Sequence, residues 1–309
     1  MRNWIKKKSK NILKLLIGLF LIVFFMKWIN LADAFDLMKD IRLSIFFFTI
    51  FLLFLVHLTK ALRTYLFMKS LNFKLNFHKN FIVHMIVPII GRFTPGQIGE
   101  GAKIFFLGKN KEITFTFILE KVIDIIILMV ISLFAIINFK FFVKSYLIFI
   151  LLAIIGVIAL LNIEKILNLI LRRKVFEKKW FKIYLRKSSP KNLALFLFFS
   201  LIVRLLLLIF PYFIALSMNI KISLLMIIQA YSLAMLVGIV SGLPGGLGSK
   251  EFTLTFLLIN FAYLNKDIAG IYTLFITFSL ILGESLFASI SYLIYKLNLF
   301  TDKDSPQTD

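Results

Sequence analysis

The sequence predicts an all-α polytopic membrane protein, and three observations lead to that fold class. Hydrophobic residues fill 60% of the 309 positions, and the mean hydropathy is +0.94. Soluble domains contain only about 45–50% apolar residues. The apolar residues form long stretches, and most charges gather in short runs between them. We therefore expect lipid, rather than the interior of a soluble domain, to cover most of this apolar surface.

Six stretches are long enough to cross a bilayer as helices, which takes about 20 mostly apolar residues. The first follows a basic start but has no small-residue cleavage site, so we interpret it as an anchor rather than a signal peptide. A basic loop of about 164–191 follows the fourth span and either rests against anionic headgroups or stays solvated. The predicted spans are about 12–31, 42–60, 113–139, 145–162, 192–217 and 269–295.

Two further apolar regions are interrupted by glycine and proline. In the first, Phe81–Ile90 and Ala102–Gly108 flank the interruption, and in the second Ile222–Val240 and Phe252–Leu264 do so. Irregular backbone at membrane depth is tolerated only where protein or a water-filled cavity satisfies its polar groups. We therefore predict two re-entrant helical hairpins, although 222–240 is also long enough to span alone.

Lysine and arginine are distributed unevenly between the two sides of the predicted bundle. With the N-terminus inside, 26 of the 37 Lys and Arg residues fall on its side and seven fall on the other. Because cytoplasmic loops carry the excess of Lys and Arg, both termini are predicted to be cytoplasmic. The same bias explains the net charge of +22, so we expect no nucleic-acid partner.

An internal repeat divides the single transmembrane domain, residues 1–309, into two units. Pro95–Gly99 and Pro244–Gly248 share the pattern Pro-Gly-x-(Ile/Leu)-Gly. Upstream, residues 71–75 and 218–222 share apolar-Asn-apolar-Lys-apolar. Each unit, about 42–139 and 192–295, then contains a span, a hairpin and a span, with opposite orientations. Inverted repeats with broken helices are typical of transporters; the alternative is a chance similarity between two turns.

The first interruption carries the signals of a helix start inside the membrane. Thr94 reads as an N-cap, Pro95 as the first helical residue and Gln97 as the third, which together form a capping-box pattern. Free N–H groups at such a start suit a phosphate, whereas the alternative is close helix packing through small residues. The candidate residues of the two interruptions are Pro95, Gly96, Gly99, Pro244, Gly245, Gly246 and Gly248.

Ionisable residues also fall inside the predicted spans, where each costs about 2.5–3.5 kcal/mol on insertion scales. Asp124, Arg204 and Glu284 reach similar depth in three different spans, which predicts a buried ion-pair network. The network either holds the bundle together or lines a path for an amphiphile with an anionic head, and we favour the path. The candidates are Arg92, Glu100, Lys103, Glu120, Lys121, Asp124, Arg204, Lys250, Glu251 and Glu284.

Catalytic and metal chemistry have little support in the sequence. Cysteine is absent, and His57, His78 and His84 lack metal-ligand spacing. We expect no metal, no cofactor and no catalytic residue.

Three blocks resemble one known family. Residues 95–103 read Pro-x-x-x-Gly-Glu-x-x-Lys, residues 120–124 read Glu-Lys-x-x-Asp, and residues 243–248 read Leu-Pro-Gly-Gly-Leu-Gly. These blocks resemble the transmembrane, flippase-like family of lysylphosphatidylglycerol synthases. Lys103 and Lys121 stand where that family has arginine, which keeps the charge but loses bidentate phosphate geometry.

The resemblance implies a lipid flippase fold in the cell membrane, as a stand-alone membrane domain. It implies translocation of a phospholipid or a polyprenyl-phosphate-linked amphiphile, with the cations attracting phosphate and the carboxylates balancing them or engaging a basic headgroup. We expect no aminoacyl transfer, because the chain ends fourteen residues after its last predicted span. The alternatives are an enzyme using a polyprenyl-phosphate sugar donor through Asp33, Asp36 and Asp40, and an accessory subunit of a glycosyltransferase.

Overall fold

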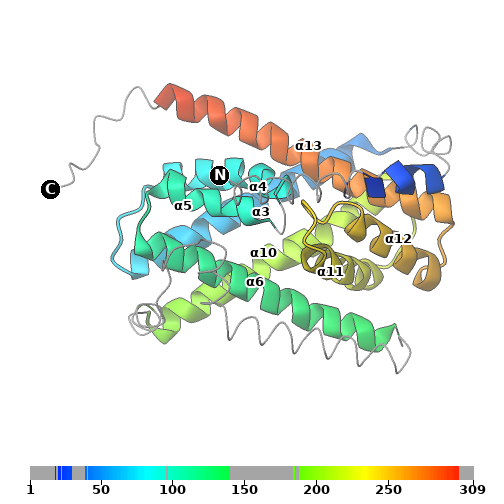
Figure 1. The fold of residues 1–309 in the computed structure, drawn as a ribbon, viewed down its shortest axis with the longest axis horizontal. Coiled ribbons are helices and arrows are strands. Elements are labelled where there is room, and N and C mark those ends of the chain that lie inside the picture. Colours follow the sequence, from blue (N-terminus) through cyan, green and yellow to red (C-terminus); the bar gives the residue numbers. More distant parts are fainter. Residues whose placement is uncertain are drawn as a thin grey trace, which may run out of the picture.

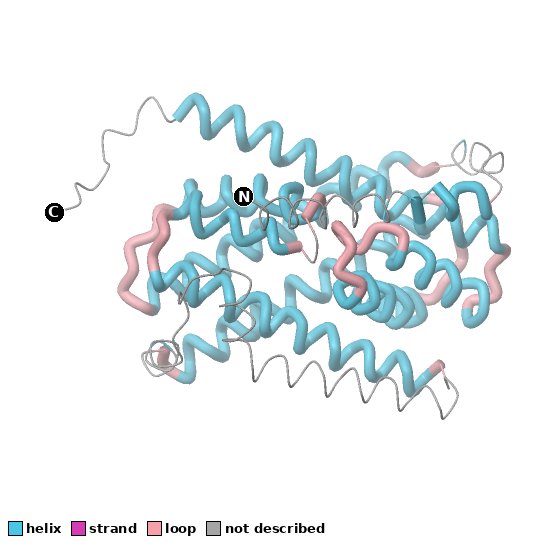
Figure 2. Tube along the Cα trace, viewed as in Figure 1, coloured by secondary structure: helices cyan, strands magenta, loops and turns pink. Residues whose placement is uncertain are grey.

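The computed structural model describes residues 18, 20–21, 23–29, 39, 41–94, 97–139, 184 and 188–298. The regular structure of these residues is helical, without a β-strand (Figure 2). The predicted span at 145–162, nearly all of the basic loop, Asp33, Asp36, Asp40 and both chain ends lie outside the described residues.

Two 28-residue apolar helices, α3 (Leu43–Ser70) and α10 (Pro190–Ser217), form the centre of the molecule. They run antiparallel, because the backbone N–H of Arg42 before α3 donates to the carbonyl of Ser217 at the end of α10, 2.8 Å away. The predicted span at 192–217 is confirmed. The predicted end of the other span at residue 60 is wrong, because α3 continues for ten more residues.

Both helices end in the same way. Asn72 and Asn219 adopt left-handed backbone conformations, with φ of 60° and 56°. The N–H group of the next residue then donates to the carbonyl five residues earlier, from Phe73 to Met68 (3.1 Å) and from Ile220 to Ala215 (2.9 Å). This is the Schellman arrangement that terminates helices. The repeated Asn motif is therefore a shared helix-ending signal.

Each unit continues with a helix, a break and a second helix. In the first unit these are α4 (Phe77–Arg92), then the short η1 (Ile98–Gly101) with α5 (Ala102–Leu107). In the second they are α11 (Leu224–Val240) and α12 (Ser249–Phe261). The two pairs approach from opposite ends of the molecule, so that their breaks lie near its centre (Figure 1).

A long helix closes each unit: α6 (Lys111–Asn138) in the first and α13 (Lys266–Asn298) in the second. α13 is long and apolar enough to cross a membrane, which confirms the span predicted there. α6 occupies the predicted 113–139 but carries Glu120, Lys121 and Asp124. The same order of elements thus occurs twice, as the repeat predicts.

The described part of the first predicted span packs against the second unit. A Cβ atom at Gly248 would lie 2.5 Å from Leu21 Cβ, and one at Gly270 would lie 2.4 Å from Ile29 Cγ2. The absence of side chains at these two glycines therefore lets the N-terminal helix lie directly on the second break and on α13.

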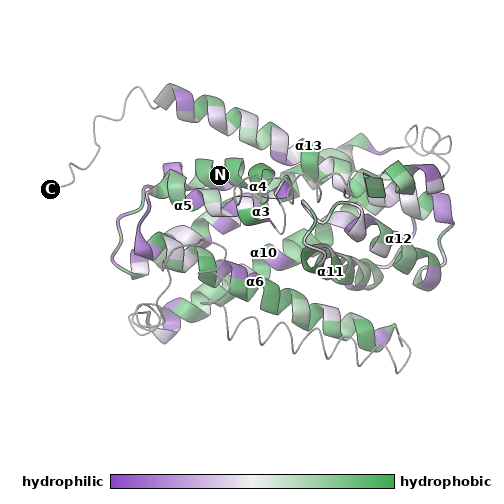
Figure 3. Cartoon of the chain, viewed as in Figure 1, coloured by the Kyte–Doolittle hydropathy of each residue, from purple (hydrophilic) through white to green (hydrophobic). Residues whose placement is uncertain are grey.

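Hydrophobic residues predominate along the helices (Figure 3), and many of their large side chains are exposed. Phe47 on α3 is 66% exposed and Phe134 on α6 is 64% exposed. Exposed phenylalanines in such numbers suit contact with lipid tails. Polar residues gather instead at the helix ends and around the centre, where the two breaks meet.

Candidate functional site: a charged cavity between the two breaks

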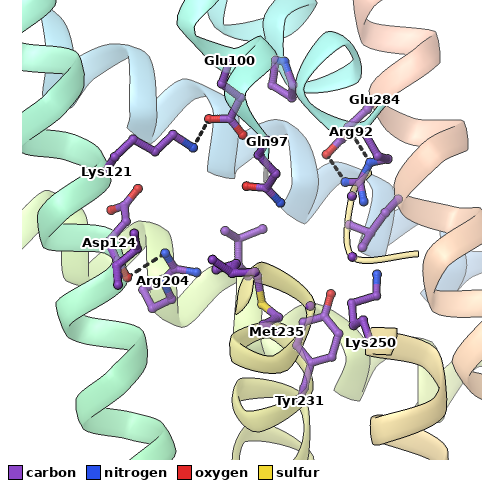
Figure 4. A pocket seen from close by; sticks show the side chains of 18 of the residues that line it. Arg92, Gln97, Glu100, Lys121, Asp124, Arg204, Tyr231, Met235, Lys250 and Glu284 are labelled. Carbon is purple, nitrogen blue, oxygen red and sulfur yellow. Dashed lines mark hydrogen bonds and ion pairs between the residues drawn. The ribbon is translucent and has the colours of Figure 1, made fainter. Parts of the chain in front are cut away.

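A cavity of about 130 Å³ lies where the two breaks meet (Figure 4). A single buried water needs only about 10–15 Å³ on such a measure, so this space can hold several waters or a small polar group. Gln97, Tyr231 and several apolar side chains also contribute to its wall. The charged residues of the wall are Lys60, Arg92, Glu100, Lys121, Asp124, Arg204, Lys250 and Glu284.

The two breaks contact each other directly at Gly245. Its φ is +59°, and a Cβ atom there would lie 2.8 Å from the carbonyl oxygen of Arg92. Only glycine suits both the left-handed conformation and the close approach. The two breaks therefore approach each other closely, and Gly245 and the neighbouring Gly246 both lie in the cavity wall.

The first break is folded differently from the capping box that its sequence predicts. Gln97 has φ of +57° and lies outside the helix, which begins at Ile98. The predicted helix start at Pro95 is therefore wrong. Thr94 instead stabilises the turn from outside, because its hydroxyl accepts a hydrogen bond from the N–H of Gly99, 2.7 Å away. Pro95 and Gly96 themselves lie outside the described residues.

Gly99 stabilises this turn by packing rather than by lining the cavity. A Cβ atom there would lie 2.6 Å from the carbonyl oxygen of Ile90. The returning chain can thus lie against the last turn of α4 only because position 99 has no side chain.

Arg92, at the end of α4, binds Glu284 of α13 through two hydrogen bonds. The distances are 2.7 Å from Nε to Oε2 and 2.5 Å from Nη2 to Oε1. This bidentate geometry is the strongest form of an arginine–carboxylate pair. The pair fixes the first break to the last helix of the second unit.

Asp124 and Arg204 are adjacent but are not ion-paired as predicted. Arg204 donates to the backbone carbonyl of Asp124 at 2.8 Å (Figure 4). The Asp124 carboxylate instead accepts from Arg63, at 2.7 Å from Nη1. Because Glu284 binds Arg92, the predicted network of Asp124, Arg204 and Glu284 is wrong in its pairing. Depth along the predicted spans does not reveal this pairing, since the span predicted at 42–60 ends before Arg63.

A second, fully buried cluster adjoins the main cavity around a space of about 20 Å³. Lys103 pairs with Glu120, and Glu120 also accepts from the Thr64 hydroxyl at 2.5 Å. Thr64 in turn lies 2.9 Å from His84 Nε2. Lys103 and Glu120 are only 5% and 2% exposed. These two predicted site residues therefore lie behind the cavity wall and not in it.

Two carboxylates next to the breaks, Glu100 and Glu251, also have partners within the protein. Lys121 of α6 pairs with Glu100 of the first break, and both side chains are partly accessible. In the second break, Glu251 accepts from the N–H of Gly248 at 2.6 Å and from the Thr277 hydroxyl at 2.5 Å. That N–H at the start of α12 is therefore occupied by the protein's own carboxylate. Pro244, Gly248 and Glu251 lie outside the cavity wall.

Lys60, Arg63, Gln97 and Tyr231 contribute to the site or its support but were not predicted. For Lys60 and Arg63 a signal was present, because the helical pattern continues to Ser70 without glycine or proline. Metal binding finds no support among the described residues, which hold no group of three His, Asp or Glu side chains able to ligate an ion.

The fold and site define a class: an all-helical membrane protein in which the same order of helices occurs twice around a charged central cavity. The family model of the lysylphosphatidylglycerol synthase TM region matches residues 11–283, and the chain belongs to that family. A comparison with curated proteins finds no match. Membership places the chain among membrane proteins of lipid-related function.

Proposed function

We propose that this protein is a multi-pass protein of the cell membrane that moves a lipid with a phosphate-bearing headgroup between leaflets. One observation carries the proposal: a polar cavity with more cations than carboxylates lies at the meeting point of two oppositely directed helix breaks. Such a site suits a charged headgroup at mid-membrane while the acyl tails remain in lipid. The proposed function requires no catalytic step.

The proposal includes the topology. Both helix–break–helix pairs are re-entrant hairpins, and both termini are cytoplasmic. Lys60, Arg63 and Lys103 belong to the cavity wall or to the buried cluster beside it rather than to cytoplasmic loops, which leaves 23 Lys and Arg residues on the inner side against seven outside. The charge bias therefore keeps its direction after this correction.

The ion pairs differ in how readily a headgroup can exchange with them. The side chains of Lys121 and Glu100 are 31% and 20% exposed, whereas those of Arg92 and Glu284 are 13% and 7% exposed. A headgroup entering the cavity therefore meets Lys121 and Glu100 at lower desolvation cost. We therefore propose that the headgroup enters the cavity beside Lys121 and Glu100. The Arg92–Glu284 pair instead holds the two units together.

Reconstitution into liposomes tests the proposal. A phospholipid with a fluorescent tail label is placed in both leaflets, and dithionite added outside destroys the fluorescence of the labels in the outer leaflet. Transport is measured as the further loss of fluorescence with time, as labelled lipid of the inner leaflet reaches the outer one. We expect wild-type protein to expose inner-leaflet lipid, and the double variant Lys60→Gln, Arg204→Gln to do so at least tenfold more slowly. Lys69→Gln, an exposed cation of α3, is the matched control. Wild-type vesicles indistinguishable from protein-free vesicles would refute the proposal and favour an accessory role.

A further inference from the structure

The charges around the cavity divide into neutralised pairs and a remainder. Each of the five carboxylates in and behind the wall has a basic partner in contact with it. The pairs are Glu284 with Arg92, Glu100 with Lys121, Glu120 with Lys103, Asp124 with Arg63, and Glu251 with Lys250. None of these carboxylates is therefore available to neutralise another cation without losing its own partner.

Two cations of the wall remain without a carboxylate among the described residues: Lys60 and Arg204. Arg204 is only 6% exposed, and its Nε has no hydrogen-bond partner within the described chain. Its one described hydrogen bond goes to a neutral backbone carbonyl. Unpaired cations at membrane depth are costly, so an anion bound in the cavity would lower that cost.

A third cation can join them. Lys250 lies 3.3 Å from Glu251, but Glu251 also accepts from Thr277 and from the N–H of Gly248. Glu251 thus remains hydrogen-bonded if Lys250 turns toward a ligand. Arg204 enters the cavity from α10 and Lys250 from α12, on different sides of the space (Figure 4).

We infer that the cavity selects a lipid whose headgroup is a terminal phosphate monoester, with Lys60, Arg204 and Lys250 as its ligands. A monoester carries about −1.5 to −2 charges at pH 7, which matches the two unpaired cations, whereas a phosphodiester carries only one. An aminoacylated headgroup would add an ammonium to a wall that already holds more cations than carboxylates. This inference rests on the proposed function, since it names the substrate class of the same site.

Binding of short-chain lipids to the purified protein tests the inference without requiring transport. The panel is dioctanoyl phosphatidic acid and farnesyl phosphate as monoesters, dioctanoyl phosphatidylglycerol as a diester, and its lysyl ester, with affinities measured by calorimetry. We expect at least one monoester to bind roughly tenfold or more tightly than phosphatidylglycerol, and the lysyl ester to bind most weakly. The order of the two monoesters distinguishes a glycerolipid from a polyprenyl source. Equal or tighter binding of phosphatidylglycerol or its lysyl ester would overturn the inference.

Variants connect that preference to the assigned residues. Lys60→Gln, at a partly buried position, should reduce the monoester-to-diester affinity ratio several-fold, and adding Arg204→Gln should bring it close to one. Lys69→Gln should leave the ratio unchanged. If the double variant does not fold, the test rests on the single Lys60→Gln variant. An unchanged affinity ratio in that variant would contradict the role of Lys60 as a phosphate ligand. A monoester preference without lipid movement would refute only the proposed function, whereas movement without the preference would refute only this inference.

Discussion

Arg63 is the residue on which the buried charges around α6 depend most directly. It is 2% exposed and donates to Asp124 at 2.7 Å and to the Ser200 hydroxyl at 2.8 Å. Glu120 lies 3.7 Å away. One guanidinium thus holds α3 against both α6 and α10, and its removal would leave a carboxylate unpaired at membrane depth.

Arg63→Leu is therefore expected to destabilise the protein by roughly 3–5 kcal/mol, the usual cost of removing one partner of a buried pair. Thermal unfolding of the detergent-purified protein measures this as a lower Tm and a lower folded yield. The control is Lys69→Leu on the same helix, where the side chain is exposed. Equal Tm values for the two variants would contradict the buried pairing.

Two neighbouring glycines provide a second matched comparison. Gly99→Ala places a methyl group 2.6 Å from the Ile90 carbonyl, so the turn must shift, at a cost of roughly 1–3 kcal/mol. Gly101→Ala places its methyl group 3.6 Å from Phe117, which is ordinary contact. We expect the Tm to fall for the first variant and to change little for the second. Similar Tm values would show that α4 and η1 are not closely packed.

At the scale of elements, the N-terminal helix covers the second break. The ideal Cβ position at Gly18 lies 3.9 Å from Leu247 Cβ, within the range of about 3.5–4.5 Å that disulfides require. This contact brings Gly18 to the loop that forms one side of the cavity.

The cysteine-free sequence makes that contact easy to test. In the double variant Gly18→Cys, Leu247→Cys we expect mild oxidation to form an intrachain disulfide, seen as loss of both maleimide-reactive thiols and their return on reduction. Phe20→Cys combined with Leu247→Cys is the control, because Phe20 is 68% exposed. Persistent thiols in the first pair, or equal oxidation of both pairs, would contradict the packing.

The positions of the helices could be predicted from the sequence better than the partners of the buried charges. Hydropathy alone predicts helices at 192–217 and 269–295, because long apolar runs leave few alternatives. It ends α3 too early, at residue 60, since cations inside the helix, such as Arg63 with its distant partner Asp124, look like loop cations in sequence. The turn after Thr94 was also mispredicted, because the contact between Gly99 and α4 is tertiary and overrides the local capping pattern.

On the scale of the whole molecule, the cavity lies where the breaks of the two units meet. The helix pairs that contain the two breaks approach the centre from opposite ends of the molecule (Figure 1). The loops that follow Asn72 and Asn219, at the ends of α3 and α10, therefore lie at opposite ends of the bundle. In the proposed topology the first of these loops faces the cytoplasm and the second faces outside.

Single cysteines at two exposed lysines test this arrangement. Lys74→Cys and Lys221→Cys occupy the same place in the repeated motif, and both positions are exposed. We expect a membrane-impermeant maleimide added to intact cells to label position 221, and to label position 74 only after the membrane is opened. Labelling of both positions from the same side would contradict the inverted repeat.

The central claim is that a lipid phosphate occupies the cavity between the two breaks. Electron cryo-microscopy of the protein in nanodiscs containing phosphatidic acid tests it most directly. We expect headgroup density in the cavity, with phosphate oxygens about 3 Å from nitrogens of Lys60 and Arg204. Lipid density confined to the outer surface of the helices, with the cavity holding water alone or closed by side chains, would contradict it.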